Sequence, residues 1–112
     1  MKYIFLSVIL LTITGSAFTQ QSPAEEIAAK IANRMKDSLQ LTTTIREQVY
    51  NANLQLHDRK MSMWQQFRNS PDTLTRMIQH IENSRDSIYK QIIGEEKFSA
   101  YFLRKKAIIN NN

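Results

Sequence analysis

A histidine and two methionines near the middle of the chain are the residues whose types and spacing could bind a metal. His57, Met61 and Met63 form an H-x-x-x-M-x-M cluster, and imidazole with thioether sulfur suits Cu(I). His57 and Met61 share one face of a helix, whereas Met63 points to another side, and His80 and Glu82 share no face either. Methionine is also a common filler of apolar cores. We therefore expect no bound metal, with His57 and Met61 as the alternative ligand pair.

The common catalytic motifs are missing from this sequence. It has two histidines and no cysteine, and it contains no G-x-S-x-G, H-E-x-x-H or glycine-rich phosphate loop. Its carboxylates lie beside lysines and arginines, as is typical of solvated helix faces. Examples are Glu47, Asp58, Glu82 and Asp86. We therefore expect a protein that is not an enzyme and that uses no cofactor.

The start of the chain is typical of a secretory signal peptide. Met1-Lys2 supply one charge, residues 3–13 form an apolar run, and residues 14–19 include small residues. The run is shorter than the roughly twenty residues that span a bilayer. We expect residues 1–19 to be cleaved and the mature protein to start near Gln20 in the periplasm, with a retained membrane anchor as the alternative. Because no cysteine follows the run, we expect no lipoprotein.

The composition of the rest predicts an all-α protein with a moderately basic surface. Two glycines and two prolines in 112 residues are too little turn material for a many-stranded fold. We expect one helical domain over residues 20–112, with a short disordered tail at residues 110–112. The formal net charge of +5 falls to +4 without Lys2. This charge favours acidic partners such as unfolded anionic segments or lipid head groups, or serves solubility alone. No nucleic-acid partner is expected, because the basic residues follow no known reading motif.

Cap residues mark the first two of four predicted helices. Ser22-Pro23-Ala24-Glu25 combines an N-cap, a proline at the first helical position and a glutamate three residues after the cap. The second helix is expected to start within Thr42 to Thr44, with Thr44 and Glu47 as a capping box, and to reach Phe67. The first break is therefore expected near Leu41.

The other two helices follow at two further breaks. Ser70-Pro71 predicts a cap and a first helical residue, and the third helix is expected to reach about Ile93. Gly94 then precedes a short basic helix. The second and third helices have similar lengths and a short connection, so we expect an antiparallel hairpin.

The apolar stripes predict how these helices pack. The N-terminal helix has one stripe, at Ile27, Ile31, Met35 and Leu39. The second helix has two stripes about a quarter turn apart, a face wide enough for two neighbours. One is Ile45, Val49, Ala52, Leu56, Met63 and Phe67; the other is Tyr50, Leu54, His57, Met61 and Trp64. The third helix has a single stripe, interrupted by Arg85 and flanked by Met77 and Tyr89, at Leu74, Ile78, Ile81, Ile88 and Ile92. The second stripe of the second helix is left for the N-terminal helix, a second subunit or a client.

Two short segments resemble the LTxxQ motifs of periplasmic stress proteins of the Spy/CpxP type. Leu41-Thr42-Thr43-Thr44-Ile45 opens the second helix with isoleucine in place of glutamine. Ile93-Gly94-Glu95-Glu96-Lys97 opens the fourth with glycine in place of threonine and lysine in place of glutamine. The passage from Arg85-Asp86-Ser87-Ile88-Tyr89 to Tyr101 is also similar to the family's passage between its third and fourth helices. The resemblance covers about Leu39 to Phe102.

The resemblance implies an antiparallel homodimer, shaped like a shallow cradle, that binds unfolded or envelope proteins without ATP. Relatives also include metal-sensing proteins, so a metal-responsive (Cu/Zn) protein and a purely structural envelope protein remain the alternatives. Trp64 and Tyr50, with a basic terminus, could also contact an anionic membrane surface. The candidate client-binding residues are Tyr50, Leu54, Arg59, Lys60, Met61, Trp64, Arg104, Lys105 and Lys106.

Overall fold

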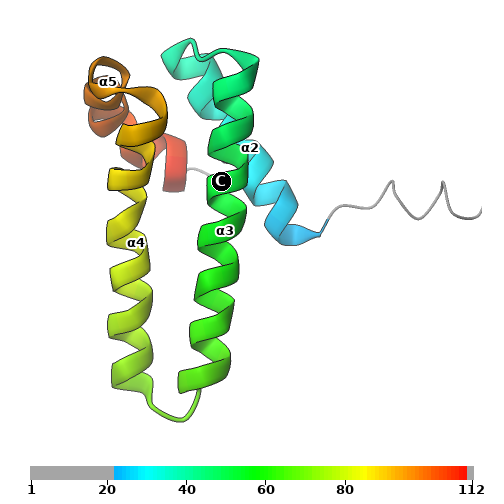
Figure 1. Ribbon diagram of the computed structural model, residues 1–112, viewed down its shortest axis with the longest axis vertical. Helices are drawn as coiled ribbons and strands as arrows, with labels where there is room; N and C mark the ends of the chain where they lie inside the picture. The colour runs from blue at the N-terminus through cyan, green and yellow to red at the C-terminus, as the bar shows by residue number, and fades with distance from the viewer. Residues whose placement is uncertain (1–21, 111–112) are drawn as a thin grey trace, which may run out of the picture.

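The structure is a computed structural model that describes residues 22–110 (Figure 1). Within this range the chain forms the α-helices α2 (Pro23–Leu39), α3 (Thr43–Phe67), α4 (Pro71–Ile93) and α5 (Glu95–Lys105), followed by the π-helical turn η1 (Lys106–Asn110). Residues 22–110 contain no strand. The predicted all-α class and the three predicted breaks are confirmed. The predicted signal peptide at residues 1–19 lies outside the described residues.

The helices α3 and α4 form the predicted antiparallel hairpin (Figure 1). The helix α2 packs against α3, while α5 packs against α4, and both α5 and η1 also touch α2. These contacts gather at the end of the hairpin where α3 begins and α4 ends. The other half of the hairpin, near the turn between α3 and α4, extends past α2 and α5 (Figure 1). No helix among residues 22–110 is both long and apolar enough to cross a membrane.

Side-chain caps explain where the first two helices begin. Ser22 and Glu25 form the predicted capping box, in which each side chain bonds the other residue's backbone N–H. Thr42 caps α3 by accepting a hydrogen bond from the Ile45 N–H at 3.1 Å. The predicted box of Thr44 and Glu47 is therefore wrong. A cap at Thr42 satisfies the free N–H of Ile45 and leaves Thr44 inside the first turn.

The start of α4 and the passage into α5 use less side-chain capping. Ser70 occupies the N-cap position of α4, but its side chain makes no cap hydrogen bond. The start of α4 therefore relies on Pro71, whose ring presets a helical φ. Gly94 ends α4 and opens α5 with φ of +86°, a conformation that glycine adopts more readily than other residues.

The core lies where α2, α3, α4, α5 and η1 meet. It is a contiguous cluster of buried side chains, Ile31, Ala32, Met35, Leu39, Leu41, Val49, Tyr89, Ile93, Tyr101 and Ile108. Leu41 and Ile93 are the first residues of the two LTxxQ-like segments, so both segments close the same core. Ile27 does not belong to the core, contrary to the predicted stripe, because 51% of its surface is exposed near the free start of α2.

The predicted stripe of α4 is wrong in its second half. The buried residues are Leu74, Ile81, Arg85, Tyr89 and Ile93. Ile88 and Ile92 are only partly buried. The buried face includes Arg85 because this side chain finds hydrogen-bond partners on α3, and it includes Tyr89 because its ring packs edge-on against Tyr101, with centroids 5.1 Å apart.

Candidate functional site

The second apolar stripe of α3 is divided by the start of α2. In the first half of α3, Tyr50 is half-buried and packs against the core, and Leu54 is also half-buried. In the second half, Met61 is 42% exposed and Trp64 is 51% exposed. This difference arises because α2 runs back along α3 and begins only at Pro23, so it covers the first half alone. We call Met61 and Trp64 the Met61–Trp64 surface.

The five basic residues of the predicted client site lie in two separate places. Arg59 and Lys60 belong to α3, whereas Arg104, Lys105 and Lys106 belong to α5 and η1, which pack against α4 and α2 rather than α3. The structure therefore does not bring the basic end of the chain next to the Met61–Trp64 surface. Arg59 is exposed, but it lies on the other side of α3 from Met61 and Trp64, where it lines a cavity with Met63 and Met77.

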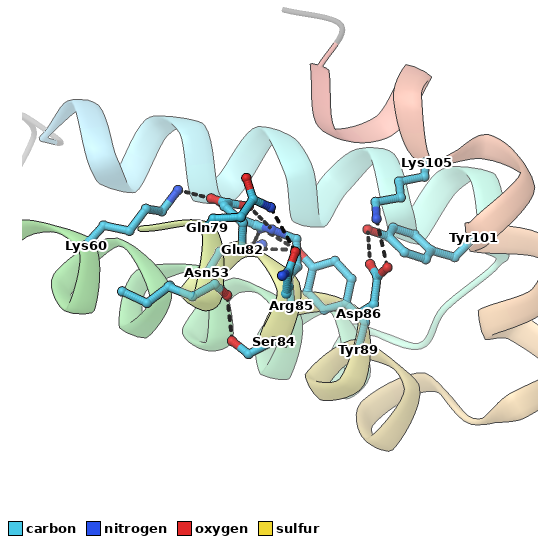
Figure 2. A network of polar contacts seen from close by, with 12 residues as sticks. Asn53, Lys60, Gln79, Glu82, Ser84, Arg85, Asp86, Tyr89, Tyr101 and Lys105 are labelled. Carbon is cyan, nitrogen blue, oxygen red and sulfur yellow. Dashed lines mark hydrogen bonds and ion pairs between the residues drawn. The ribbon is translucent and has the colours of Figure 1, made fainter. Parts of the chain in front are cut away.

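Several of these cations hold the fold together. Lys60 forms an ion pair with Glu82 on α4. Lys105 Nζ donates a hydrogen bond to Asp86 Oδ2 at 2.8 Å, and Figure 2 shows Tyr101 reaching the same carboxylate. The predicted surface carboxylates Glu82 and Asp86 thus join helices to one another. Each is partly buried.

The C-terminal end of α2 is capped by side chains from α5. Lys97 Nζ donates to the backbone carbonyls of Leu39 and Gln40, at 2.8 and 2.9 Å. Arg104 Nη1 donates to the carbonyl of Ser38 at 2.6 Å. Carbonyls at a helix C-terminus have no partner inside the helix, and cations there also complement the helix dipole. Lys97, which stands at the glutamine position of the second LTxxQ-like segment, therefore ties that segment to the end of α2, just before the first segment begins at Leu41.

A buried polar cluster joins α3 to α4 next to the core, to which its member Tyr89 belongs (Figure 2). Arg85 is buried, and its Nη1 donates to Asn53 Oδ1 at 2.6 Å and to the Tyr89 hydroxyl at 3.1 Å. The Tyr89 hydroxyl also donates to Asn53 Oδ1, at 2.5 Å. On its other side the Arg85 guanidinium binds Glu82, with Nε 3.2 Å from Oε2. Glu82 thus accepts from both Arg85 and Lys60.

The cluster is charged under ordinary conditions. Burial by itself would raise the pKa of the Glu82 carboxyl, but hydrogen bonds from Arg85 and Lys60 outweigh it and lower that pKa. Burial also opposes the charge on Arg85, yet Tyr89 and Glu82 outweigh it and raise the pKa of the guanidinium. Burial raises the pKa of the Tyr89 hydroxyl, which therefore stays protonated. The cluster therefore contains a charged Glu82 carboxylate paired with a charged Arg85 guanidinium, and a neutral Tyr89 hydroxyl.

His57 and Met61, the alternative ligand pair, do not line a common cavity. His57 lines a cavity between α2 and α3, whereas Met61 is exposed. A second cavity, between α3 and α4, is lined by Met63, Met77 and His80, together with Arg59, Ser62 and Ile81. Within residues 22–110 no three histidine, aspartate or glutamate side chains come together as a metal-binding group.

Asn53, Arg85 and Tyr89 are the site residues that sequence reasoning missed. The available signal was a polar residue at a core position on each of two neighbouring helices. Asn53 lies one turn before the buried Leu56, and Arg85 lies four residues after the buried Ile81. A polar side chain among buried apolar positions requires a hydrogen-bond partner. Asn53 and Arg85 stand at such positions on two neighbouring helices, so they could have been predicted to bond each other.

Comparisons of the chain with protein-family models, with curated proteins and with solved structures found no match.

Proposed function

We propose that the protein is an exported, ATP-independent periplasmic chaperone or envelope-stress adaptor that binds unfolded or acidic protein clients. The observation that carries this proposal is the Met61–Trp64 surface, where two large apolar side chains of one helix face are exposed beyond the reach of α2. Exposed apolar groups that lie together are typical of protein interaction sites. The similarity of two segments to LTxxQ motifs supports the same function.

The chemistry of this surface fits a client that exposes apolar side chains. Met61 offers a flexible thioether that adapts to irregular partners, and Trp64 offers a large flat ring. The basic net charge of the chain would attract acidic clients, and this attraction would weaken with salt. We therefore expect client binding to have an apolar part that resists salt and an electrostatic part that salt reduces.

An aggregation assay on the purified protein tests this function. Changing Met61 and Trp64 together to serine should abolish most of the protection of an aggregating client, while the helical circular dichroism signal stays unchanged. The matched control is Phe102→Ser with Leu103→Ser, which removes two exposed apolar residues from α5 instead. Equal loss in both double variants would contradict a specific surface. If the wild-type protein slows aggregation at no salt concentration, the chaperone proposal is wrong, and a structural envelope role is the remaining alternative.

Export and dimerisation belong to the same proposal. Cleavage at the predicted signal peptide requires a mature N-terminus between Phe18 and Ser22, which mass spectrometry of the envelope fraction would detect. The half of the hairpin that α2 and α5 leave uncovered is available to a second copy in antiparallel orientation (Figure 1). Sedimentation should then give the mass of a homodimer. An intact Met1 in the membrane fraction would contradict cleavage of the signal peptide. A monomer at high protein concentration would contradict dimerisation.

The cavity lined by Met63, Met77 and His80 favours a copper-responsive protein as the second candidate function. Two thioethers and one imidazole form a soft ligand set that prefers Cu(I) to harder cations. Replacing Met63 and Met77 by leucine keeps their apolar volume and should remove Cu(I) binding in a competition assay with a chromogenic chelator. Met61→Leu is the control, because it removes the thioether of the pair predicted from the sequence. Loss of binding in the control alone would favour His57 and Met61.

A further inference from the structure

A cavity of about 70 Å³ lies between α2 and α3 and opens beside Ile27. Its apolar wall comes from α2, and consists of Ala24, Ile27, Ala28 and Ile31. Its polar wall comes from the hairpin, and consists of Asn53, His57, Lys60 and Arg85. The volume exceeds the roughly 10–15 Å³ that one water needs. The cavity therefore has room for a small organic group with one apolar and one polar side.

Asn53 contributes an unpartnered donor to this wall. The side chain is 6% exposed, and its Nδ2 has no hydrogen-bond partner among the described residues. The orientation of the amide follows from its neighbours, since Arg85 can only donate and therefore requires Oδ1 on its side. A buried amide N–H without an acceptor is unfavourable, so this position requires an oxygen from outside the described chain.

The charges of the polar wall agree with that requirement. Arg85 and Lys60 are both paired with Glu82, so two cations share one carboxylate. Arg85 Nη2 donates one bond, to Glu82 Oε1 at 3.4 Å, and Lys60 Nζ donates one bond to the same oxygen. Because a guanidinium Nη carries two N–H groups and an ammonium carries three, both cations keep donors in excess of the acceptors around them. The wall is positive and rich in donors.

We infer that this cavity binds the carboxylate of a small acid or acidic side chain, with the aliphatic stem against Ile27 and Ala28. The carboxylate oxygens would accept from Asn53 Nδ2 and from the free donors of Arg85 and Lys60. Glutamate and aspartate side chains of a polypeptide and free short-chain acids share this chemistry. The cavity is distinct from the Met61–Trp64 surface, so the inference holds whether or not that surface binds clients.

Titration of the ¹⁵N-labelled protein with propionate tests the inference directly. We expect the Asn53 side-chain amide signals to shift in a saturable manner, and the neutral isostere propionamide to bind at least about tenfold more weakly, because hydrogen bonds to a charged group are the stronger ones. A capped Ala-Glu-Ala peptide is compared in the same way. Tighter binding of the peptide identifies a polypeptide side chain as the ligand, and tighter binding of propionate identifies a free acid.

Two variants separate binding from folding. Asn53→Asp keeps an oxygen acceptor for Arg85 and Tyr89 but replaces the donor by a negative charge. It should abolish propionate binding, followed in this variant by the backbone amide signals of Ile27 and His57 in the cavity wall, while the helical signal persists. Lys60→Gln should weaken binding by about tenfold, whereas Lys106→Gln, on η1, should not. Unshifted Asn53 signals at saturating propionate, equal binding of propionamide, or undiminished binding in Asn53→Asp would each overturn the inference and indicate that only water occupies the cavity. None of these outcomes depends on the aggregation assay.

Discussion

Arg85 Nη1 and Asn53 Oδ1 lie 2.6 Å apart inside the interface between α3 and α4. Together with the ion pair of Lys60 and Glu82, this contact joins the two long helices of the hairpin by polar groups in addition to apolar packing. A slip of one helix by a single turn would separate the pair and leave a buried guanidinium N–H and a buried amide oxygen without each other, which is unfavourable. The pair therefore favours one register of the hairpin, and the bond of Tyr89 to Asn53 and the ion pair of Glu82 with Lys60 favour the same register.

The core and the exposed apolar positions should respond differently to truncation. Leu56→Ala removes a fully buried side chain and should lower the free energy of unfolding by about 2–5 kcal/mol. Ile27→Ala removes a half-exposed side chain of similar size and should cost about 1 kcal/mol or less. Urea unfolding of both variants measures the difference. Equal losses would mean that α2 packs more deeply on α3 than the structure indicates.

Acid should destabilise the protein partly through Glu82. The pKa of Glu82 in the folded protein lies below its ordinary value of 4.5. The stabilisation by this carboxylate is therefore fully present above pH 4.5 and is lost as the pH falls through the folded-state pKa. The free energy of unfolding should decline less steeply in Glu82→Gln than in the wild type across this range. Identical pH profiles would show that the Glu82 carboxylate gains nothing from Arg85 and Lys60.

Alkaline pH should act through the two buried tyrosines. Burial raises the pKa values of Tyr89 and Tyr101 above their ordinary value of 10.0. Their stabilisation is therefore complete below pH 10, and it is lost as the pH rises from there through the folded-state pKa values, because the unfolded chain releases these protons first. The free energy of unfolding should fall above pH 10. A Tyr89→Phe, Tyr101→Phe double variant should lose less over the same range, as followed by circular dichroism; an equal loss would point to other groups.

The helices and their order could be predicted from the sequence because local chemistry determines them. Ser22, Pro71 and Gly94 act within a few residues of their own positions, so their effects do not depend on the rest of the fold. The wrong capping box at Thr44 is also a local matter, because Thr42 and Thr44 lie two residues apart and either could cap the helix. The hairpin followed from two long helices and a short connection.

Side-chain burial could be predicted less well, because it depends on contacts between distant segments. Arg85 interrupts an apolar stripe in the sequence, and only its pairing with Asn53, 32 residues away, makes it a core residue. Likewise, the stripe of α3 is uniform along the sequence, but α2 divides it into the covered Tyr50 and the exposed Trp64. The cavity beside Asn53 forms from both helices, so neither segment alone could indicate it.

The contact of α5 with the end of α2 should contribute to stability through Lys97. Lys97→Met keeps most of the aliphatic stem but removes the ammonium that bonds the carbonyls of Leu39 and Gln40, so it should lower the free energy of unfolding by about 1–2 kcal/mol. Lys106→Met is the matched control, because Lys106 is an exposed residue of η1 and should change stability by less than about 0.5 kcal/mol. Thermal and urea unfolding of both variants measure these values. The loss in Lys97→Met should also shrink at high salt, because screening weakens the attraction between the ammonium and the helix end. If both variants were equally stable, the contact of α5 with the end of α2 would depend on the apolar packing of the core, which includes Leu41 and Ile93, instead.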